Sequence, residues 1–449
     1  MINDKFSSWL PRWEPENESF WSETGSKIAW RTLILTTISL ILSFSTWFVM
    51  SALVVRLPAI GFKYTTMELF WLTAMPGLAG GTLRVIHTFL IPIYGTRNVI
   101  TWATLIKIIP CLGIGFAVIS PDTPFWLFMS LAFLVGMGGG DFSSYMPSTS
   151  LFFPKRLQGT ALGIQAGVGN FGVSLTQFLT PWIITFPLFG VLAGAPQIFK
   201  KGDVVSNIWC QNAVFWYVPL LLLLGFLCWF MLRSVPVHAS FKEQLDIFKD
   251  KHTWFCTITY VMTFGSFSGF AAAFPMMIKT VYGEFPGAPD PLKYAFYGPL
   301  IGSLMRVVMG PVSDKIGGGI LTQVSGLGLI TCCFFLIITG ALTPTSMDQF
   351  PLFVALMMGI FFFTGIGNAS TFRQYPIIFK HSQRQGAQVL GWTGAVAAYG
   401  PFLFASLIGS SVTHMGSAQP FFYGTIGFYI LAVTINWWYY TRSNCERPS

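Results

Sequence analysis

Long apolar stretches separated by short polar ones run through the whole chain of 449 residues. A helix needs about 20 consecutive apolar residues to cross the hydrocarbon core of a bilayer. Charged residues make up only 10% of the chain, against about 25% in a typical soluble protein. We therefore expect an all-α membrane protein with about twelve transmembrane helices, at residues 32–56, 68–93, 98–119, 124–151, 158–186, 212–233, 253–279, 293–312, 318–341, 350–378, 386–410 and 418–440.

The distribution of Lys and Arg predicts how these helices are oriented. With both termini placed in the cytoplasm, most of the 26 Lys and Arg residues fall on the cytoplasmic side, as the positive-inside rule requires. The net charge of +9 is then a consequence of topology. The lipid bilayer is the expected partner, and no soluble basic domain indicates a nucleic-acid partner.

Nothing in the sequence indicates an enzyme or a bound cofactor. The seven cysteines are scattered, mostly within the apolar stretches, and show no metal-ligand spacing. Phosphate-loop and dinucleotide fingerprints are missing from the sequence, as are paired carboxylates and nucleophile arrangements. We expect no catalytic residue, no metal and no cofactor.

Two arginines lie in the middle of predicted spans, where a charge costs several kcal/mol. Arg84 and Arg306 also have similar surroundings, Gly80-Gly81-Thr82-Leu83-Arg84-Val85 and Gly302-Ser303-Leu304-Met305-Arg306-Val307. Neither has a carboxylate within one turn of its own helix. The pattern predicts that both face an interior cavity and that their charge partner is a small anion from outside.

A repeat at about half the chain length relates the two parts of the sequence. Gly138-Gly139-Gly140-Asp141-Phe142-Ser143-Ser144-Tyr145 resembles Gly365-Ile366-Gly367-Asn368-Ala369-Ser370-Thr371-Phe372, and Gln158-Gly159 resembles Gln385-Gly386. Two six-helix repeats are the layout of a major facilitator transporter, with the substrate between them near mid-membrane. We expect a cytoplasmic N-terminal segment at 1–31, a helical bundle at 32–233, a cytoplasmic linker with a short amphipathic helix at 234–251, a second bundle at 252–440 and a cytoplasmic tail at 441–449.

The glycine-rich segments resemble the signature of the nitrate/nitrite porter family within the major facilitators. The resemblance covers essentially the whole chain and is carried by the segments 140–146, 152–155, 158–174 and 365–372, of which the string from Gln158 to Ser174 is the longest. The N-terminal Trp13-Glu14-Pro15-Glu16 is similar to the NarK-type exchangers of bacteria. The resemblance implies a multi-pass protein of the bacterial cytoplasmic (inner) membrane that takes nitrate and nitrite as substrates and works as a monomer.

The same resemblance implies the substrate-binding residues. Arg84 and Arg306 match the paired arginines that clamp the anion, and a planar guanidinium suits a planar trigonal oxyanion. Tyr260 and Asn170 match hydrogen-bonding residues. The aromatic walls correspond to Phe142 and Phe264, which would leave a flat slot that rejects tetrahedral phosphate.

Three residues depart from the family pattern or add charge near the predicted path. Asp141 stands where the family usually has asparagine, and we expect it to neutralise part of the arginine field, to carry a proton, to pair with Lys155 or to cap a cytoplasmic helix end. His87 lies one turn beyond Arg84 and is a candidate for coupling, or a helix-packing residue. For Lys107 the expectation is a side chain that extends to the membrane surface. Asp314 resembles a gating residue of the loop between spans eight and nine.

The predicted transport reaction is exchange of nitrate for nitrite by alternating access. Two unfilled arginines repel each other, so only the loaded carrier is expected to close and cross. The alternative is proton-coupled nitrate symport through Asp141 or His87. Further alternatives are an organophosphate exchanger, a channel and a nitrate sensor, which the aromatic content, the repeat and the short tails respectively disfavour.

Overall fold

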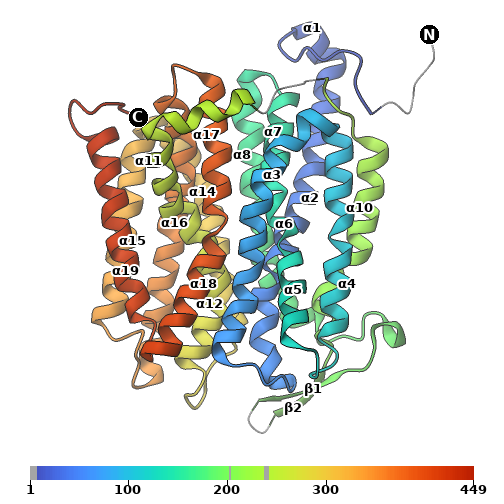
Figure 1. Ribbon diagram of the computed structural model, residues 1–449, viewed down its shortest axis with the longest axis vertical. Helices are drawn as coiled ribbons and strands as arrows, with labels where there is room; N and C mark the ends of the chain where they lie inside the picture. The colour runs from blue at the N-terminus through green and yellow to red at the C-terminus, as the bar shows by residue number, and fades with distance from the viewer. Residues whose placement is uncertain (1–7, 202–203, 237–241) are drawn as a thin grey trace.

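The computed structural model describes residues 8–201, 204–236 and 242–449, which form a bundle of long helices running between two ends (Figure 1). The first part of the chain contributes α1 (Glu18–Phe20), α2 (Ser26–Leu53), α3 (Thr66–Ile106), α4 (Ile108–Ala117), α5 (Phe125–Val135), α6 (Met137–Gly140), α7 (Phe142–Phe152), α8 (Lys155–Ile183), α9 (Asn212–Phe215) and α10 (Tyr217–Met231). The second part contributes α11 (Lys251–Tyr260), α12 (Ser266–Tyr282), α13 (Leu292–Ala295), α14 (Tyr297–Ile316), α15 (Gly318–Ile338), α16 (Phe350–Ile378), α17 (Gln383–Ala397), α18 (Gly400–Met415) and α19 (Gln419–Asn436).

Short irregular helical segments join or interrupt these helices. The π-helical segments are η1 (Trp21–Gly25), η5 (Val261–Gly265) and η7 (Trp437–Thr441). The 3-10 segments are η2 (Val54–Ile60), η3 (Gly190–Ala193), η4 (Lys242–Lys249) and η6 (Met347–Gln349).

The predicted membrane-spanning architecture is confirmed. Ten helical segments within the described residues are long and apolar enough to cross a bilayer. One of them, Thr66–Ala117, contains 52 residues and therefore holds both the second and the third predicted span. Helix α8, of 29 residues, coincides with the predicted fifth span and packs along α2. Together these segments account for the twelve predicted spans.

Gly95 separates the second and third spans within α3. Its φ of 78° and ψ of 158° are not helical, so the chain turns there and starts a new helix. A Cβ at this position would lie 2.4 Å from the Ser234 hydroxyl. Both the left-handed backbone and the close approach require glycine. At its other end, α3 begins with a capping box, in which the Thr65 hydroxyl accepts from the Glu68 amide and the Glu68 carboxylate accepts from the Thr65 amide.

A π-helical segment interrupts the seventh span near mid-length. Segment η5 lies between α11 and α12 and is buried apart from Val261. Such insertions change the angular spacing of side chains and occur often at functional sites. Here Tyr260 and Phe264 stack with ring centres 5.5 Å apart and an interplanar angle of 9°. The interruption therefore presents two aromatic rings as one wall.

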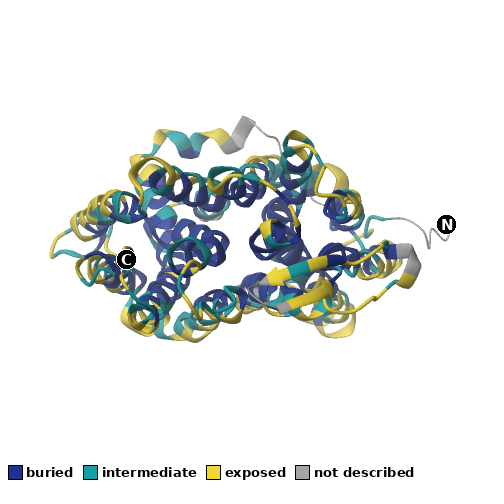
Figure 2. Cartoon of the chain, turned by 90° about the horizontal axis from the view of Figure 1, so that it is seen from below, coloured by how far each residue is buried: buried dark blue, intermediate teal, exposed yellow. Residues whose placement is uncertain are grey.

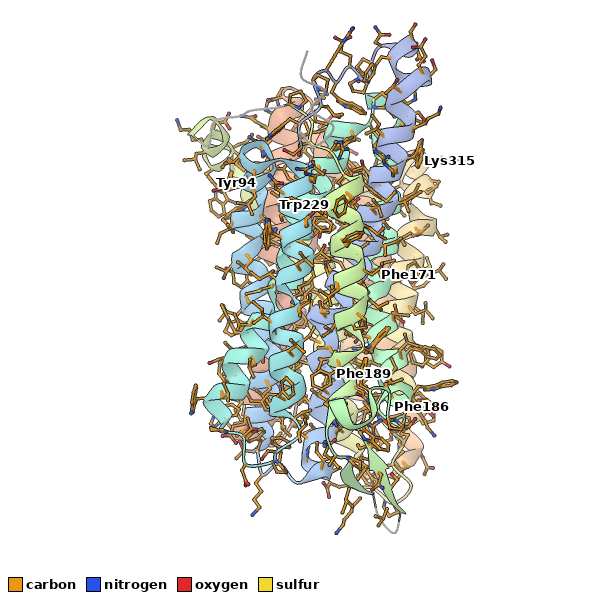
Figure 3. The ribbon with its side chains drawn as sticks, turned by 90° about the vertical axis from the view of Figure 1, so that its right-hand side faces the viewer. Tyr94, Phe171, Phe186, Phe189, Trp229 and Lys315 are labelled. Carbon is orange, nitrogen blue, oxygen red and sulfur yellow. The ribbon has the colours of Figure 1, made fainter. Side chains whose placement is uncertain are left out.

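The distribution of buried and exposed side chains is the one expected for a protein in a bilayer. Seen from one end, the buried residues face the inside of the helical assembly and the exposed ones its periphery (Figure 2). Many exposed side chains are large and apolar, including Trp102, Trp126 and Trp182. Aromatic side chains also lie toward both ends of the bundle, with Tyr94 and Trp229 toward one end and Phe186 and Phe189 toward the other (Figure 3). Tyr and Trp, as at the first of these ends, are the aromatic residues that gather at membrane–water interfaces.

One element was not predicted from the sequence. Residues between α8 and α10 form an antiparallel hairpin of β1 (Gln197–Lys201) and β2 (Val204–Ile208), with Gln197 opposite Ile208. It lies at the end of the bundle opposite the two termini (Figure 1). The Gln197 side chain anchors it by accepting from the Cys210 amide and donating to Gln211.

The hairpin end is also where the first and second parts of the chain are tied together. Arg56, in η2, forms an ion pair of 2.5 Å with Asp290, which precedes α13. Lys279, at the end of α12, donates to the Val55 carbonyl at 2.7 Å. The Arg56 guanidinium also lies 5.5 Å from the ring centre of Phe199 in β1. These contacts close the molecule at this end.

The N-terminal segment packs against the end of α7. Trp13 contacts the rings of Phe20 and Phe152 and donates to the Leu151 carbonyl at 3.0 Å. Trp21 is 6% exposed and packs against Phe153. The end of α7 and the following Phe153 therefore provide a protein surface for both tryptophans, of which Trp21 is buried and Trp13 partly buried.

The linker expected at 234–251 includes residues 237–241, which lie outside the described residues. Its described part contains η4, a 3-10 helix where an amphipathic helix was expected. Phe248 packs against Trp392 of α17 at 4.7 Å, and Asp246 accepts from Gln385 at 2.9 Å. The linker is thus held against the second part of the chain.

The C-terminal tail is expected to loosen from the bundle in acid. Hydrogen bonds from Lys251 at 2.8 Å and His252 at 3.0 Å lower the pKa of Glu446 from 4.5 to about 2. A carboxyl group with a lowered pKa stabilises the folded state fully above its unfolded pKa. This contribution is lost as the pH falls from 4.5 toward 2. The thermal unfolding midpoint of the detergent-solubilised protein, followed in low salt, measures it.

The matched comparison is Glu446→Gln with Glu23→Gln, an exposed acid of the N-terminal segment. Glu446→Gln should unfold at a lower temperature than the unmodified chain at pH 7 and differ less from it at pH 3. Because the Glu446 side chain is 44% exposed, added salt should shrink the difference. An identical acid response in all three proteins would contradict the role given to Glu446.

Candidate anion-binding site

Arg84 is completely buried in the middle of α3. Its Nε donates to the Gly139 carbonyl of α6 and its Nη1 donates to the Gly394 carbonyl of α17, both at 2.8 Å. These two bonds link elements from the first and second parts of the chain. Its Nη2 atom has no hydrogen-bond partner.

Arg306 occupies the corresponding position in α14 and is 7% exposed. Its guanidinium carbon lies 4.6 Å from the ring centre of Phe372. Both Nη1 and Nη2 are buried without a hydrogen-bond partner. The guanidinium group therefore packs on an aromatic face, and these two nitrogens remain without a partner.

Phe264 brings the two arginines to one site. Its ring centre lies 5.2 Å from the guanidinium carbon of Arg84 and 5.9 Å from that of Arg306. Tyr260, stacked on Phe264, lies close enough to both guanidinium groups to interact electrostatically with each. The structure thus assembles Arg84, Arg306, Tyr260 and Phe264, which the sequence comparison had singled out.

Phe142 forms a further wall at Arg84. It is the first residue of α7, and its ring centre is 4.7 Å from the Arg84 guanidinium carbon. Phe44 stacks on Phe142 from α2 at 6.1 Å. Aromatic faces at these distances stabilise a buried cation without neutralising it.

Asn170 is buried in α8, and both its amide oxygen and its amide nitrogen lack a hydrogen-bond partner. A buried amide of this kind costs free energy unless it acquires a partner. The orphaned amide is compatible with the predicted role in anion binding. Asn170 forms no hydrogen bond with Arg84 or Arg306 in the described chain.

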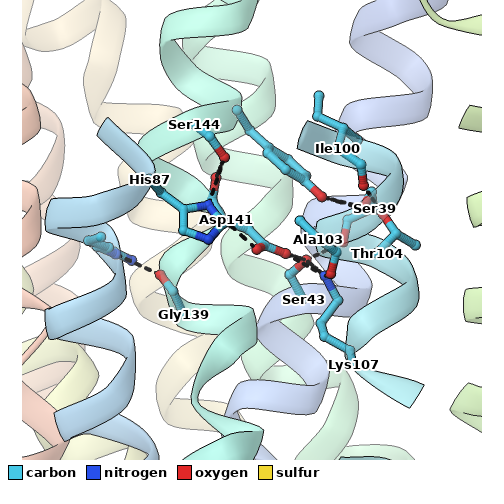
Figure 4. Close-up of polar contacts among 12 residues, drawn as sticks. Ser39, Ser43, His87, Ile100, Ala103, Thr104, Lys107, Gly139, Asp141 and Ser144 are labelled. Carbon is cyan, nitrogen blue, oxygen red and sulfur yellow. Dashed lines mark hydrogen bonds and ion pairs between the residues drawn. The ribbon is translucent and has the colours of Figure 1, made fainter. Parts of the chain in front are cut away.

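The guanidinium groups of Arg84 and Arg306 form no ion pair within the described part of the chain. The one carboxylate buried among the described residues is Asp141, and it is occupied elsewhere. Lys107 donates to Asp141 and, at 2.7 Å, to the Ala103 carbonyl (Figure 4). Ser43 also donates to the same Asp141 oxygen, at 2.6 Å.

This arrangement corrects two expectations. Asp141 pairs with Lys107, and its side chain does not cap a helix end. The side chain of Lys155, the other expected partner, lies outside the described part of the structure. Lys107 is 1% exposed and does not extend to the membrane surface. The physical reason is that a buried carboxylate and a buried ammonium group each supply the partner that makes burial of the other tolerable. Sequence spacing gave no sign of the pair, since the two residues are 34 positions apart.

The other candidate residues occupy different places. His87 Nδ1 lies 3.0 Å from the Ser144 hydroxyl and 4.0 Å from Asp141, so it belongs to the network around Asp141 (Figure 4). Asp314 lies at the exposed end of α14 and pairs with Arg373 of α16 at 2.7 Å. This ion pair is exposed, unlike the buried site, and both helices belong to the second part of the chain.

Sequence reasoning missed three aromatic residues that contact the arginines. Trp47 of α2 lies 5.4 Å from the Arg84 guanidinium carbon, Phe44 lies 6.0 Å from it, and Phe372 supports Arg306. Phe372 could have been found, because it ends the repeated segment that starts at Gly365. Among 45 Phe and 16 Trp, no signal distinguished Phe44 and Trp47.

Comparisons with known proteins give the family. The sequence profile of the Major Facilitator Superfamily matches residues 33–376. The "Probable nitrate/nitrite antiporter NarK2" of Thermus thermophilus is 58% identical over 449 residues, covering 100% of both chains. The "Nitrate/nitrite transporter NarU" of Escherichia coli is 38% identical and covers 98% of both chains.

The fold is also that of a solved transporter. A bacterial homologue of the human lysosomal transporter Spinster, in an inward-facing and unoccupied conformation, superimposes with a TM-score of 0.63 at 15% identity, over 91% of this chain and 96% of that one. Membership in a transporter superfamily agrees with the prediction that the chain is not an enzyme. The chain belongs to the major facilitator superfamily of secondary transporters and, within it, to the family of nitrate/nitrite porters.

Proposed function

We propose that this protein exchanges nitrate for nitrite by alternating access, with the anion bound between Arg84 and Arg306. The observation that carries the proposal is the set of unused donors. Arg84 Nη2 and Arg306 Nη1 and Nη2 are buried and have no hydrogen-bond partner in the described chain. Three guanidinium NH2 groups without a carboxylate favour an anion, and a planar trigonal oxyanion matches planar donors.

The aromatic surroundings support a small, flat ligand. Phe264 lies beside both guanidinium groups, and Phe142 and Phe372 cover one each. Rings at these positions leave room for coplanar oxygens and oppose tetrahedral ones. Nitrate binding should therefore persist in excess phosphate, whereas strong competition by phosphate would exclude this account of selectivity.

The charges of the site support exchange rather than uniport. From the distances to the Phe264 ring centre, the two guanidinium carbons lie no more than about 11 Å apart. At an effective dielectric constant of about 20, their repulsion is about 1.5 kcal/mol or more. An anion between them removes this cost, so the loaded carrier closes more readily than the empty one.

The proposal includes the topology and the assembly state. Residues 32–233 and 252–440 form two six-helix bundles joined by the linker at 234–251, with the segments 1–31 and 441–449 in the cytoplasm of a bacterium and the β1–β2 hairpin outside. The excess of Lys and Arg at the end that carries the termini supports this orientation. The site lies within a single chain, which supports a functional monomer.

The alternative is proton-coupled nitrate symport, with Asp141 or His87 as the proton site. The ion pair between Asp141 and Lys107 is unfavourable to it, because the Asp141 carboxylate already has a buried ammonium partner. His87 is the remaining candidate, and it lies next to the same pair.

Purified protein in liposomes distinguishes the two reactions. Vesicles are loaded with nitrite or left empty, and entry of labelled nitrate is followed with and without an inward proton gradient. We expect entry only into nitrite-loaded vesicles and no response to the gradient. Gradient-driven entry into empty vesicles would establish symport instead.

Substitution of Asn170 by leucine is expected to weaken nitrate binding about tenfold or more, because a hydrogen bond to a charged group contributes about 1.5–3 kcal/mol. The thermal stability of the ligand-free protein should stay unchanged or rise, since the substitution removes an amide that has no partner. Calorimetric titration with nitrate and thermal unfolding measure the two effects.

Asn436→Leu is the matched control for Asn170→Leu. The Asn436 amide is fully bonded, donating to Gly319 and Gln323 and accepting from Gln374. Its loss should lower stability and leave nitrate affinity nearly unchanged. The role assigned to Asn170 fails if its leucine variant loses stability in the same way while binding nitrate normally.

A further inference from the structure

A buried network of charged and polar groups lies directly behind the Arg84 half of the site. Lys107 and Asp141 are each 1% exposed and form an ion pair, with Ser43 donating to Asp141 at 2.6 Å. Lys107 also contacts Ser43 at 3.0 Å. The three groups come from α2, from the junction of α3 and α4, and from the junction of α6 and α7, as Figure 4 shows.

Asp141 occupies the break between α6 and α7, and both sides of that break contact Arg84. The Gly139 carbonyl, two residues before Asp141, accepts from Arg84 Nε. The ring of Phe142, the residue after Asp141, lies 4.7 Å from the Arg84 guanidinium carbon. A shift of Asp141 therefore displaces an acceptor and an aromatic wall of the same arginine.

A second connection runs through α3 itself. His87 follows Arg84 by three residues, on a neighbouring position of the same helical face. Its Nδ1 lies 3.0 Å from the Ser144 hydroxyl, which donates to the Asp141 carbonyl at 3.0 Å. The network thus contacts the helix that carries Arg84 as well as the helices that pack against it.

The charges of Lys107 and Asp141 also affect how strongly the site attracts an anion. Asp141 is the one carboxylate buried among the described residues, and Arg84 is a buried cation without a carboxylate partner in the same region. A free Asp141 carboxylate would compete with the substrate for the positive field of Arg84. Lys107 occupies this carboxylate, so the two arginines keep their charge for the anion.

We propose that Lys107 and Asp141 form a positioning pair for the anion site, which holds the Gly139 and Phe142 contacts of Arg84 and makes nitrate binding independent of proton uptake. The inference rests on the proposed function, and it deepens that function by naming what keeps the exchange free of protons. Neither residue contacts the anion. Both act through Arg84.

The titratable and charged groups around Asp141 come from four elements. They are Arg84, His87 and Lys107 on α3 and its end, Cys111 on α4, Tyr145 on α7 and Cys228 on α10. Lys107 is the one fixed cation in direct contact with the Asp141 carboxylate in the described chain. Removing it leaves His87 at 4.0 Å as the nearest basic group.

The test measures nitrate affinity of the detergent-solubilised full chain by calorimetric titration between pH 6 and 8. The unmodified protein should bind with no pH dependence. In Lys107→Met the unpaired Asp141 carboxylate opposes the anion until it takes up a proton. We expect binding about tenfold weaker at pH 8 than at pH 6, with proton uptake on binding in weakly buffered solution.

The double variant Lys107→Met/Asp141→Asn removes both charges and keeps a polar group at position 141. Asn at position 141 can still accept from the Ser43 hydroxyl and so hold the α6–α7 break in place. The double variant should therefore bind nitrate within about threefold of the unmodified protein and without pH dependence, because no unpaired charge competes with the anion. A merely structural pair would give no pH dependence in the single variant. That outcome, or a folded double variant that binds nitrate poorly, would overturn the proposal.

Folding of the variants is followed by size-exclusion chromatography. If Lys107→Met does not fold, the double variant decides. Recovery of folded protein with pH-independent binding supports the proposal, and a double variant no better folded than the single one overturns it. Failure of the proposed function is recognised separately, because the unmodified protein would then bind no nitrate at all.

Discussion

Replacement of Arg84 by lysine is expected to lower nitrate–nitrite exchange at least about 100-fold. Lysine keeps the charge but has no planar fork, so it cannot donate to Gly139 and Gly394 and also present a donor to the anion. Loss of two hydrogen bonds that involve a charged group corresponds to roughly 3 kcal/mol or more. Initial rates of nitrite-driven nitrate entry into liposomes measure the effect.

Arg442→Lys is the control for this experiment. Arg442 lies beyond α19 at the end that carries the termini, where it stacks on Trp438 at 4.1 Å and donates to the Trp438 carbonyl. Its replacement should leave exchange within about twofold of the unmodified rate, as expected for a surface position. Exchange by Arg84→Lys at close to the normal rate would mean that charge alone suffices at this site.

The ion pair between Arg56 and Asp290 is expected to govern opening at the hairpin end. It joins residues 234 positions apart, and the two side chains are 8% and 22% exposed. Removal of one partner of a buried pair costs about 3–5 kcal/mol, less where water reaches one group as it does here. Asp290→Asn should therefore favour the state open at this end and slow exchange about tenfold or more.

Exchange of the two charges tests the pair itself. Arg56→Asp alone places two carboxylates together and should nearly abolish transport, whereas Arg56→Asp/Asp290→Arg should recover a substantial part of it. The exposed pair Arg12–Glu14, with side chains 63% and 45% exposed, provides the comparison, and Arg12→Gln should have almost no effect. If the exchanged pair transports no better than Arg56→Asp, the contact does not control opening.

The structure and the sequence agree where local chemistry is decisive. Long apolar stretches need a bilayer, and each must be a helix there because lipid offers no hydrogen-bond partners to the backbone. The predicted span 350–378 coincides with α16 (Phe350–Ile378). The repeat and the two mid-span arginines pointed to one buried site, and Phe264 indeed contacts both guanidinium groups.

The sequence was less informative where partners come from distant segments. The β1–β2 hairpin was missed because its residues carry only a weak alternating pattern. Trp13 and Trp21 contact Phe152 and Phe153 near the end of α7, far away in the sequence. Helix η4 and the tail are held by contacts such as Phe248–Trp392, which no local pattern indicates.

What the sequence determined by itself is the membrane-spanning helical fold, the repeat and the identity of the two arginines, because hydrophobic length and the cost of a buried charge act at single positions. Which groups satisfy those charges was decided by the tertiary structure alone. Lys107 and Asp141 form an ion pair although they are 34 positions apart in the sequence, whereas Arg84 and Arg306 keep donors that have no hydrogen-bond partner. A buried charge is tolerated only through a neighbour at contact distance, and that neighbour exists only once the helices have packed.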